Sequence, residues 1–314
     1  MKTLTLSLFS LTLWAATASA HPVFVTVDEA KALKDKPDTV FVFTDADKEY
    51  DKGHIPGSAL AFAHDLHFLD DVKACKGLPM CEARAAEFIG KTLGISDATP
   101  VVVYDNGTGV NASGAWFFLA LYGHKNVKIL DGGLAAWKAK ALPVEEGKPK
   151  PMAAKTFAPK VAWDMIATRD EVVKATKEPA GYLIVDARHN LEEYAGKTLQ
   201  SALTSPGKEI TVARGGFIPG AVFSPWTKYA GNRNAEAGKP TLKDSADIKK
   251  QLEKLKKTGY GEKKTVISYC HVGLGRGSFQ YLALKEGGHQ NVKLYIGSWD
   301  EWGNDASLPV GTQP

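Results

Sequence analysis

The chain has 314 residues, of which 44% are hydrophobic, and it carries 39 basic and 35 acidic residues with a formal net charge of +4. This length is typical of two domains, and the apolar content is sufficient for ordinary hydrophobic cores. The charges form no basic block, so the sequence gives no indication of nucleic-acid binding.

Residues 1–20 have the pattern of a secretory signal peptide. Lys2 supplies a short positive region, residues 4–16 are apolar, and residues 18–20 (Ala-Ser-Ala) form a small-residue cleavage pattern. The apolar run is shorter than the roughly 20 residues that a transmembrane helix needs, and no other stretch of the sequence is as apolar over such a length. We therefore expect an exported protein, periplasmic in a Gram-negative bacterium, with no stable membrane insertion after cleavage. An uncleaved N-terminal anchor is the alternative.

The predicted elements run in the same order through two halves of the chain. Apolar strands are predicted in the first half at Val40–Phe43, residues 101–104 and Val127–Leu130, and in the second half at Tyr182–Val185, residues 266–269 and Val292–Ile296. Predicted helices separate these strands. Such alternation is typical of the α/β class and predicts, in each half, a parallel sheet flanked by helices on both faces.

An internal repeat explains this order. Residues 101–137 align without gaps on residues 266–302, and Gly53–Ser58 (GHIPGS) resembles Gly216–Ala221 (GFIPGA). We infer a duplicated domain, with one copy at residues 21–145 and the other at 161–314. The linker is predicted at residues 146–160, which are rich in Pro, Lys and Ala.

The chain has three cysteines. Cys75 and Cys81 are separated by five residues in a polar segment, so a local disulfide is a reasonable expectation in an oxidising compartment. That pairing leaves Cys270 as a single thiol, which indicates a chemical function rather than a role in core packing. No Cys/His spacing resembles a zinc site, and no metal is expected.

Cys270 directly follows a predicted buried strand and precedes a glycine-containing loop, with a helix predicted to start near residue 278. Loop N–H groups and the positive end of that helix can point at the sulfur and favour the thiolate. Arg276 adds positive charge on the same turn. The alternative is a buried structural cysteine.

The repeat aligns Cys270 with Asp105 of the first half. A carboxylate at that position cannot carry sulfur and would repel an anionic donor. The first half is therefore predicted to be structural or to shape the substrate pocket, and the second half to carry the chemistry near the interdomain cleft.

The chain resembles the tandem-domain rhodaneses, which are the thiosulfate and 3-mercaptopyruvate sulfurtransferases. In that family the C-terminal domain is catalytic, and the N-terminal domain has lost its cysteine, usually to Asp. The markers recur in order in both halves: Glu49-Tyr50, Gly53–Ser58 and Asp131–Trp137 in the first, and Asp186-Ala187-Arg188, Glu193-Tyr194, Gly216–Ala221, the Cys270 loop and Gly297–Trp302 in the second.

The resemblance implies a double-displacement sulfur transfer that needs no metal or organic cofactor. The Cys270 thiolate would take sulfur from a small anionic donor, thiosulfate or 3-mercaptopyruvate, and pass it as a persulfide to cyanide or to a thiol acceptor, which could be a protein thiol. Arg188 and Arg276 are candidates for binding the dianionic donor, with a structural pair between Arg188 and Asp186 or Glu193 as the alternative. Backbone amides would stabilise the negative sulfur, and they are those of the loop residues His271, Val272, Gly273, Leu274 and Gly275.

The loop sequence Cys-His-Val-Gly-Leu-Gly-Arg departs from the family, whose thiosulfate members usually carry Cys-Arg-x-Gly-x-Thr and whose mercaptopyruvate members carry Cys-Gly-x-Gly-x-Thr. The charge that Arg276 and His271 offer favours thiosulfate. His271 could supply a proton or partial positive charge, or be exposed and idle. A further expectation concerns Thr198–Arg214, a segment inserted relative to the first half that could shape the pocket.

Two other functions fit the same loop. Cys270-x5-Arg276 resembles the phosphate loop of cysteine-dependent phosphatases and arsenate reductases. Against this, Tyr269 stands where those enzymes usually have His, and no Asp is recognisable as a general acid. The third possibility is a sulfur-carrier protein that holds a persulfide without rapid turnover.

Overall fold

The computed structural model describes residues 22–199, 203–205 and 208–312. The predicted signal peptide lies outside the described residues. Within them, no helix combines the length and apolar character that crossing a membrane would require.

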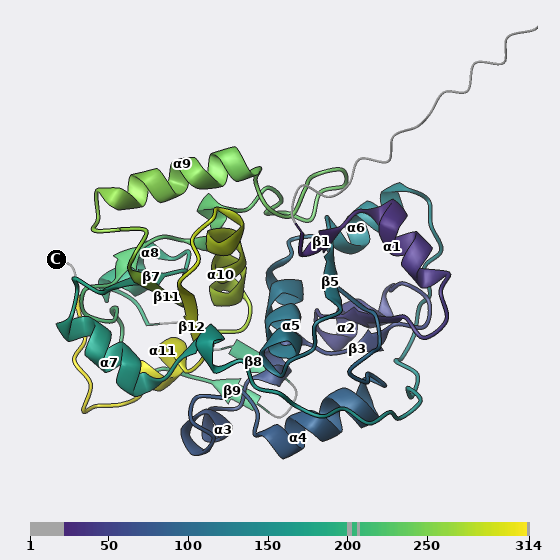
Figure 1. Ribbon diagram of the computed structural model, residues 1–314, viewed down its shortest axis with the longest axis horizontal. Helices are drawn as coiled ribbons and strands as arrows, with labels where there is room; N and C mark the ends of the chain where they lie inside the picture. The colour runs from purple at the N-terminus through teal and green to yellow at the C-terminus, as the bar shows by residue number, and fades with distance from the viewer. Residues whose placement is uncertain (1–21, 200–202, 206–207, 313–314) are drawn as a thin grey trace, which may run out of the picture.

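The two halves lie side by side and share one topology (Figure 1). Each contains a five-stranded parallel sheet, with strand order β1-β5-β4-β2-β3 in the first half and β10-β7-β11-β12-β6 in the second. Read in opposite directions, these orders match strand for strand. The predicted fold of two tandem domains with parallel sheets is confirmed.

The first half is built from the following elements: β1 (Phe24–Val25), α1 (Val27–Lys34), β2 (Val40–Phe43), α2 (Asp47–Asp51), β3 (Ala59–Leu60), a 3₁₀ turn (Ala63–Leu66), α3 (Leu69–Ala74), α4 (Glu82–Glu87) continued by a π-helical turn (Phe88–Thr92), β4 (Val101–Tyr104), α5 (Val110–Leu121), β5 (Val127–Leu130) and α6 (Gly133–Ala139).

The second half repeats this series and adds a hairpin, β8–β9, and the long helix α9. Its elements are a 3₁₀ turn (Trp163–Met165), β6 (Ile166–Ala167), α7 (Arg169–Lys177), β7 (Tyr182–Asp186), α8 (Leu191–Ala195), β8 (Leu203–Ser205), β9 (Lys208–Ile210), β10 (Val222–Phe223), a 3₁₀ turn (Trp226–Lys228), α9 (Ser245–Lys256), β11 (Thr265–Tyr269), α10 (Arg276–Glu286), β12 (Val292–Tyr295) and α11 (Ser298–Trp302).

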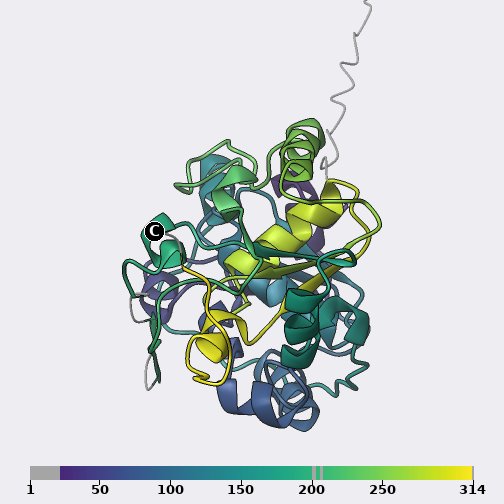
Figure 2. The same cartoon turned by 90° about the vertical axis from the view of Figure 1, so that its left-hand side faces the viewer.

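Alternate residues of the central strands pack against helices on opposite faces, as a strand period of two requires. In β4, Val101 and Val103 belong to the cluster that includes α5, whereas Val102 and Tyr104 belong to the cluster that includes α1 and α6. In the second half, β11 divides its side chains in the same way between α10 on one face and α7 and α11 on the other. Figure 2 views these layers from the side of the second half.

The halves are joined through α5 and α10, which pack against each other at the centre of the molecule (Figure 1). Phe117 of α5 meets Tyr281 of α10 edge to face, with ring centroids 5.0 Å apart. Gly114 lets the second half approach closely, because a Cβ there would lie 2.9 Å from the backbone nitrogen of Gly275. One hydrophobic cluster therefore runs through both halves.

A segment of the second half, residues 231–242, also lies across the loop that follows β4. Thr241 accepts a hydrogen bond from the backbone N–H of Gly132 at 3.0 Å. A Cβ on Gly109 would meet the Thr241 side chain, and one on Gly107 would meet Ala235. The first-half loop is thus covered by the second half.

The predicted linker, residues 146–160, contains no helix or strand and is bound to the first half. The Lys155 backbone N–H donates to Gly90 and that of Lys160 to Tyr122, and Phe157 is buried. Cys75 and Cys81 form a disulfide in the loop between α3 and α4, and Cys270 is a free, buried thiol.

The strand register relates the two halves residue by residue. Tyr104 pairs with Phe43 and Tyr269 with Asp186, so Asp45 corresponds to Arg188. Within the inserted segment Thr198–Arg214, the described residues Leu203–Ser205 and Lys208–Ile210 form the β8–β9 hairpin.

The close approach at Gly114 predicts that Gly114→Ala destabilises the protein, although alanine favours a helix over glycine by about 1 kcal/mol. The added methyl group must displace the backbone at Gly275, and overpacking of this kind costs about 1–3 kcal/mol. We expect a melting temperature lower by a few degrees in thermal unfolding. Gly261→Ala is the control, because its new Cβ would meet nothing nearer than the Lys264 side chain at 3.8 Å. A Gly114→Ala protein at least as stable as this control would contradict the close packing.

Candidate active site

Cys270 lies at the carboxyl end of β11, immediately before the loop that leads into α10. Its backbone is held by α11, because Ser298 accepts a hydrogen bond from the Cys270 N–H at 3.1 Å and the Trp299 N–H donates to the Cys270 carbonyl at 3.1 Å. A Cβ on Gly277 would lie 3.5 Å from Cys270 Sγ. The sulfur therefore lies against the first turn of α10, where the helix dipole favours negative charge.

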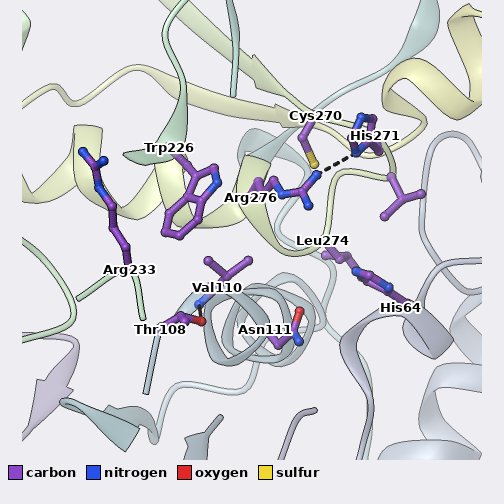
Figure 3. Close-up of a pocket in the computed structure, with 11 residues that line it drawn as sticks. His64, Thr108, Val110, Asn111, Trp226, Arg233, Cys270, His271, Leu274 and Arg276 are labelled. Atoms are coloured by element: carbon purple, nitrogen blue, oxygen red, sulfur yellow. Dashed lines mark hydrogen bonds between the residues drawn. The ribbon is translucent and has the colours of Figure 1, made fainter. Parts of the chain in front are cut away.

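The thiol opens into a pocket of about 260 Å³ between the two halves (Figure 3). Cys270 itself is 2% exposed, so access to its sulfur is through this pocket. Both halves contribute lining residues: His64, Thr108, Val110 and Asn111 from the first, and Trp226, Arg233, Cys270, His271, Val272, Leu274 and Arg276 from the second. The thiol, Arg276 and His271 therefore lie in one cavity. Their positions do not decide between thiosulfate and 3-mercaptopyruvate as the sulfur donor.

His271 connects Arg276 to Glu193. Arg276 Nη1 lies 2.8 Å from His271 Nδ1, the contact dashed in Figure 3, and His271 Nε2 lies 2.9 Å from Glu193 Oε2. A guanidinium can only donate, so Nδ1 accepts and the ring proton is on Nε2, which donates to the carboxylate. His271 is neutral in this arrangement.

The surroundings of His271 favour that neutral form. Burial lowers the pKa of His271, the hydrogen bond to Glu193 opposes this, and the charges of Arg276 and Arg188 lower it further. His271 is therefore buried and not exposed, in contrast to one alternative from the sequence. Its neutral form supplies no positive charge of its own. Its role in the structure is to orient the guanidinium of Arg276.

The loop residues divide into two groups. His271, Val272 and Leu274 line the pocket with Arg276, whereas Gly273 and Gly275 are not among its lining residues. Gly273 has φ of +75°, and a Cβ there would lie 2.7 Å from the Ile296 carbonyl oxygen, so its contribution is to the shape of the loop.

Two of the loop amides that the sequence predicted around the sulfur have hydrogen-bond partners within the loop. The Leu274 N–H donates to the Val272 carbonyl at 2.9 Å, and the Gly275 N–H donates to Ser278 Oγ at 2.8 Å. The thiol in turn donates to the Gly273 carbonyl, with Sγ 3.7 Å from the oxygen. In this form of the protein the loop satisfies these two amides internally.

The first half shows what the same kind of loop does around an anion. The Asp105 carboxylate accepts backbone N–H groups from Gly107 at 2.8 Å, Gly109 at 2.9 Å, Asn111 at 3.2 Å and Ala112 at 3.4 Å. Burial, together with the charge of Asp105, raises the pKa of neighbouring Asp45 to about 7. The amides of the first-half loop are thus bound by a carboxylate of the chain itself, at the position where the repeat aligns Asp105 with Cys270.

Arg188 is paired with Asp186 in this structure. Its side chain is fully buried, and its Nε lies 3.0 Å from both carboxylate oxygens of Asp186 while Nη2 lies 2.6 Å from Asp186 Oδ2 and from the Gly216 carbonyl. The guanidinium also lies over the Trp299 ring, 4.8 Å from its centroid. These contacts are those of the structural alternative, and Arg188 is not among the residues that line the Cys270 pocket.

Several lining residues were not singled out from the sequence. Trp226 and Arg233 follow β10, whose carboxyl end lies at the same edge of the sheet as that of β11. This position after a strand is the feature of the sequence from which they could have been predicted. Thr108 lies in the loop that aligns with the Cys270 loop, and Val110 and Asn111 begin the helix α5 that follows it. No lining residue comes from the described part of Thr198–Arg214, so a pocket-shaping role for that segment has no support among these residues.

The lining residues contain no Asp or Glu, so the described pocket has no carboxylic acid to protonate a leaving group. In the described part of the chain, no group of three or more His, Cys, Asp or Glu side chains is placed to hold a metal ion. The arrangement suits attack by a thiolate on a donor whose leaving group is already a stable anion.

Comparisons with known proteins agree with this chemistry. The family model of the rhodanese-like domain matches the chain twice, at residues 26–140 and 168–305. The thiosulfate sulfurtransferase of Pseudomonas aeruginosa is 32% identical over 279 residues, which are 87% of this chain and 91% of that protein. A relative from Mycolicibacterium smegmatis is 32% identical over 292 residues, which are 92% of this chain and 97% of its own.

Among solved structures, SseA from Escherichia coli, described as a 3-mercaptopyruvate sulfotransferase, has a TM-score of 0.68 and 26% identity, covering 88% of this chain and 98% of its own. The chain thus combines this fold, the duplicated domain and the thiol at the end of β11 with similarity to relatives over nearly their full length. The chain belongs to the rhodanese family and is a tandem-domain sulfurtransferase.

Proposed function

We propose that this sulfurtransferase takes its sulfur from thiosulfate and passes it, through a persulfide on Cys270, to cyanide or a thiol. The observation that carries the proposal is the placement of Cys270 and Arg276 in one pocket, with Arg276 oriented by His271. A guanidinium held in this way suits an inorganic dianion. Relatives named for thiosulfate favour this donor over 3-mercaptopyruvate.

The first half-reaction balances without a co-reactant. The Cys270 thiolate attacks the outer sulfur of thiosulfate and forms a new S–S bond, the bond to the central sulfur breaks, and its electron pair leaves with sulfite. Cysteine persulfide and sulfite together carry the same charge as thiolate and thiosulfate. No proton is required by the leaving group, which agrees with a pocket whose described lining has no carboxylic acid.

The second half-reaction transfers the outer persulfide sulfur to a nucleophile and returns Cys270 as a thiolate. Cyanide is small enough to enter a 260 Å³ pocket directly. A thiol acceptor must present its sulfur through the same opening, because Cys270 is otherwise buried. A small thiol or an extended protein segment meets that requirement.

We also propose that the protein is exported. The pattern of residues 1–20 supports this, and the Cys75–Cys81 disulfide is of the kind that persists in oxidising compartments. Intact mass of the protein purified from the periplasm of its own or a related host should match a chain that starts at residue 21. Recovery of the full 314-residue chain from the cytoplasm would contradict export.

Persulfide formation is the direct test of the sulfurtransferase chemistry. Reduced protein incubated with thiosulfate should gain about 32 Da, one sulfur atom, in intact-mass measurement, and cyanide should remove the gain. Cys270→Ser should show no adduct. Absence of an adduct with thiosulfate and with mercaptopyruvate, together with Cys270-dependent hydrolysis of an aryl phosphate, would instead establish the phosphatase. A stable adduct with slow turnover would identify a sulfur carrier.

The contact between His271 and Arg276 predicts a pH dependence of donor binding. Because the pKa of His271 is lowered, the neutral ring persists until the pH falls below about 6.5, and protonation then removes the lone pair that holds Arg276. Glu193 neutralises the added charge, so the loss of orientation should dominate, and KM for thiosulfate should rise as the pH falls.

The control is His271→Gln, since glutamine can accept from Arg276 and donate to Glu193 but does not titrate. Its KM should vary less with pH than that of the wild type. Each measurement needs a check of folding, because a lowered histidine pKa also makes the free energy of unfolding decrease as the pH falls below about 6.5. Identical pH profiles for the two proteins would contradict the role given to His271.

A further inference from the structure

Trp226 presents an unusual polar atom to the active-site pocket. Its Nε1 is buried and has no hydrogen-bond partner among the described residues. By contrast, Trp137, Trp299 and Trp302 each donate their indole N–H to a backbone carbonyl, at 2.9, 2.9 and 2.8 Å. Buried donors in folded proteins are almost always hydrogen-bonded, so this N–H calls for an acceptor that the described residues do not supply.

The surroundings of the ring indicate where that acceptor lies. The indole packs edge to face on Phe279, with centroids 5.4 Å apart, and the Trp226 N–H of the backbone donates to Ala187 at 3.1 Å. The first contact positions the ring, and the second fixes the backbone that carries it. In Figure 3 the edge that carries Nε1 faces toward Arg276 and Cys270.

The charges around this edge favour an anion. Arg276 and Arg233 line the same pocket, and no Asp or Glu does so among the described residues. Among the described residues, Arg276 hydrogen-bonds to His271 through Nη1, which leaves N–H groups of the guanidinium that can face a ligand. A phenylalanine can also make an aromatic contact with Phe279, whereas the hydrogen-bond donor at this position is specific to tryptophan.

We infer that the Trp226 indole N–H donates a hydrogen bond to the oxyanion of the sulfur donor and, with Arg276, holds it while its outer sulfur faces Cys270. This inference rests on the proposed function and adds a second donor group to it. A sulfonate-type group suits the pair, because its three oxygens can accept from a guanidinium and an indole at the same time. Trp226 is then a binding residue for the loading step only, since cyanide carries no oxyanion.

The two half-reactions separate this role from a structural one. In Trp226→Phe, persulfide formation from thiosulfate at subsaturating concentration should be roughly tenfold slower, the effect of losing a hydrogen bond to a charged group. Discharge of the preformed persulfide to cyanide should be unchanged. Trp163→Phe is the matched control, because Trp163 is 43% exposed and lies outside the pocket lining. Equal slowing of both half-reactions would indicate a structural role and overturn the inference, as would unchanged loading.

A second measurement keeps the inference testable if Trp226→Phe folds poorly or if thiosulfate is not the donor. Sulfite is added to ¹⁵N-labelled Cys270→Ser protein, and the indole N–H signals are followed by NMR at constant ionic strength, with chloride as the control anion. The Trp226 signal, identified by its absence in Trp226→Phe, should move with saturation while the signal of Trp163 does not.

These readings distinguish the two proposals. Wild-type protein that forms no persulfide refutes thiosulfate as the donor, whereas a saturable shift of the Trp226 signal with sulfite would still support an oxyanion at this N–H. If the wild type forms the persulfide but sulfite does not shift the Trp226 signal, the proposed function stands and the inference about Trp226 is overturned.

Discussion

The structure depends on the packing of α5 against α10. Both helices follow a central strand of a parallel sheet, and both begin at a loop that can surround an anion. Packing the two helices side by side therefore brings two such loops to the same opening, and the catalytic pocket forms between them. Gly114 is where this arrangement is tightest, because the backbone at Gly275 occupies the space of its missing side chain.

The two copies of the domain share one topology but differ in the residue that follows the central strand. In the first half a carboxylate from the chain itself, Asp105, takes the backbone N–H groups of the loop. In the second half a thiol stands at the same position, and Arg276 places positive charge in the same pocket. The network from Glu193 through His271 to Arg276 ties that charge to α8, an element distant in sequence from the loop.

The sequence was sufficient to predict the fold, the duplication and the thiol, because these depend on local patterns. Buried strands, glycine turns and an ordered repeat are each visible in a few residues. The pairing of Arg188 with Asp186 was left open, since residues two apart can be partners or point to different sites, and only the tertiary burial of both decides it. The partnership of His271 and Arg276 with Glu193 depends on a contact 78 positions away.

Trp226 and Arg233 illustrate the same limit. Arg233 lies in residues 231–242, a segment that contacts the first half through Thr241, whereas Trp226 precedes that segment and packs on Phe279. The sheet order places the end of β10 near the thiol, but a side chain's direction there is set by packing that no short pattern encodes.

The glycines of the first-half loop have a wider meaning for how such sequences are interpreted. Gly107 and Gly109 resemble the glycines of a working anion loop, yet in this molecule Ala235 and Thr241 of the other half fill the space beside them. A side chain at either position would be rejected by the neighbouring domain, whatever the loop once bound. Glycines in such a loop are therefore no proof, by themselves, that the loop binds a ligand, because the contact between two domains can require them as well.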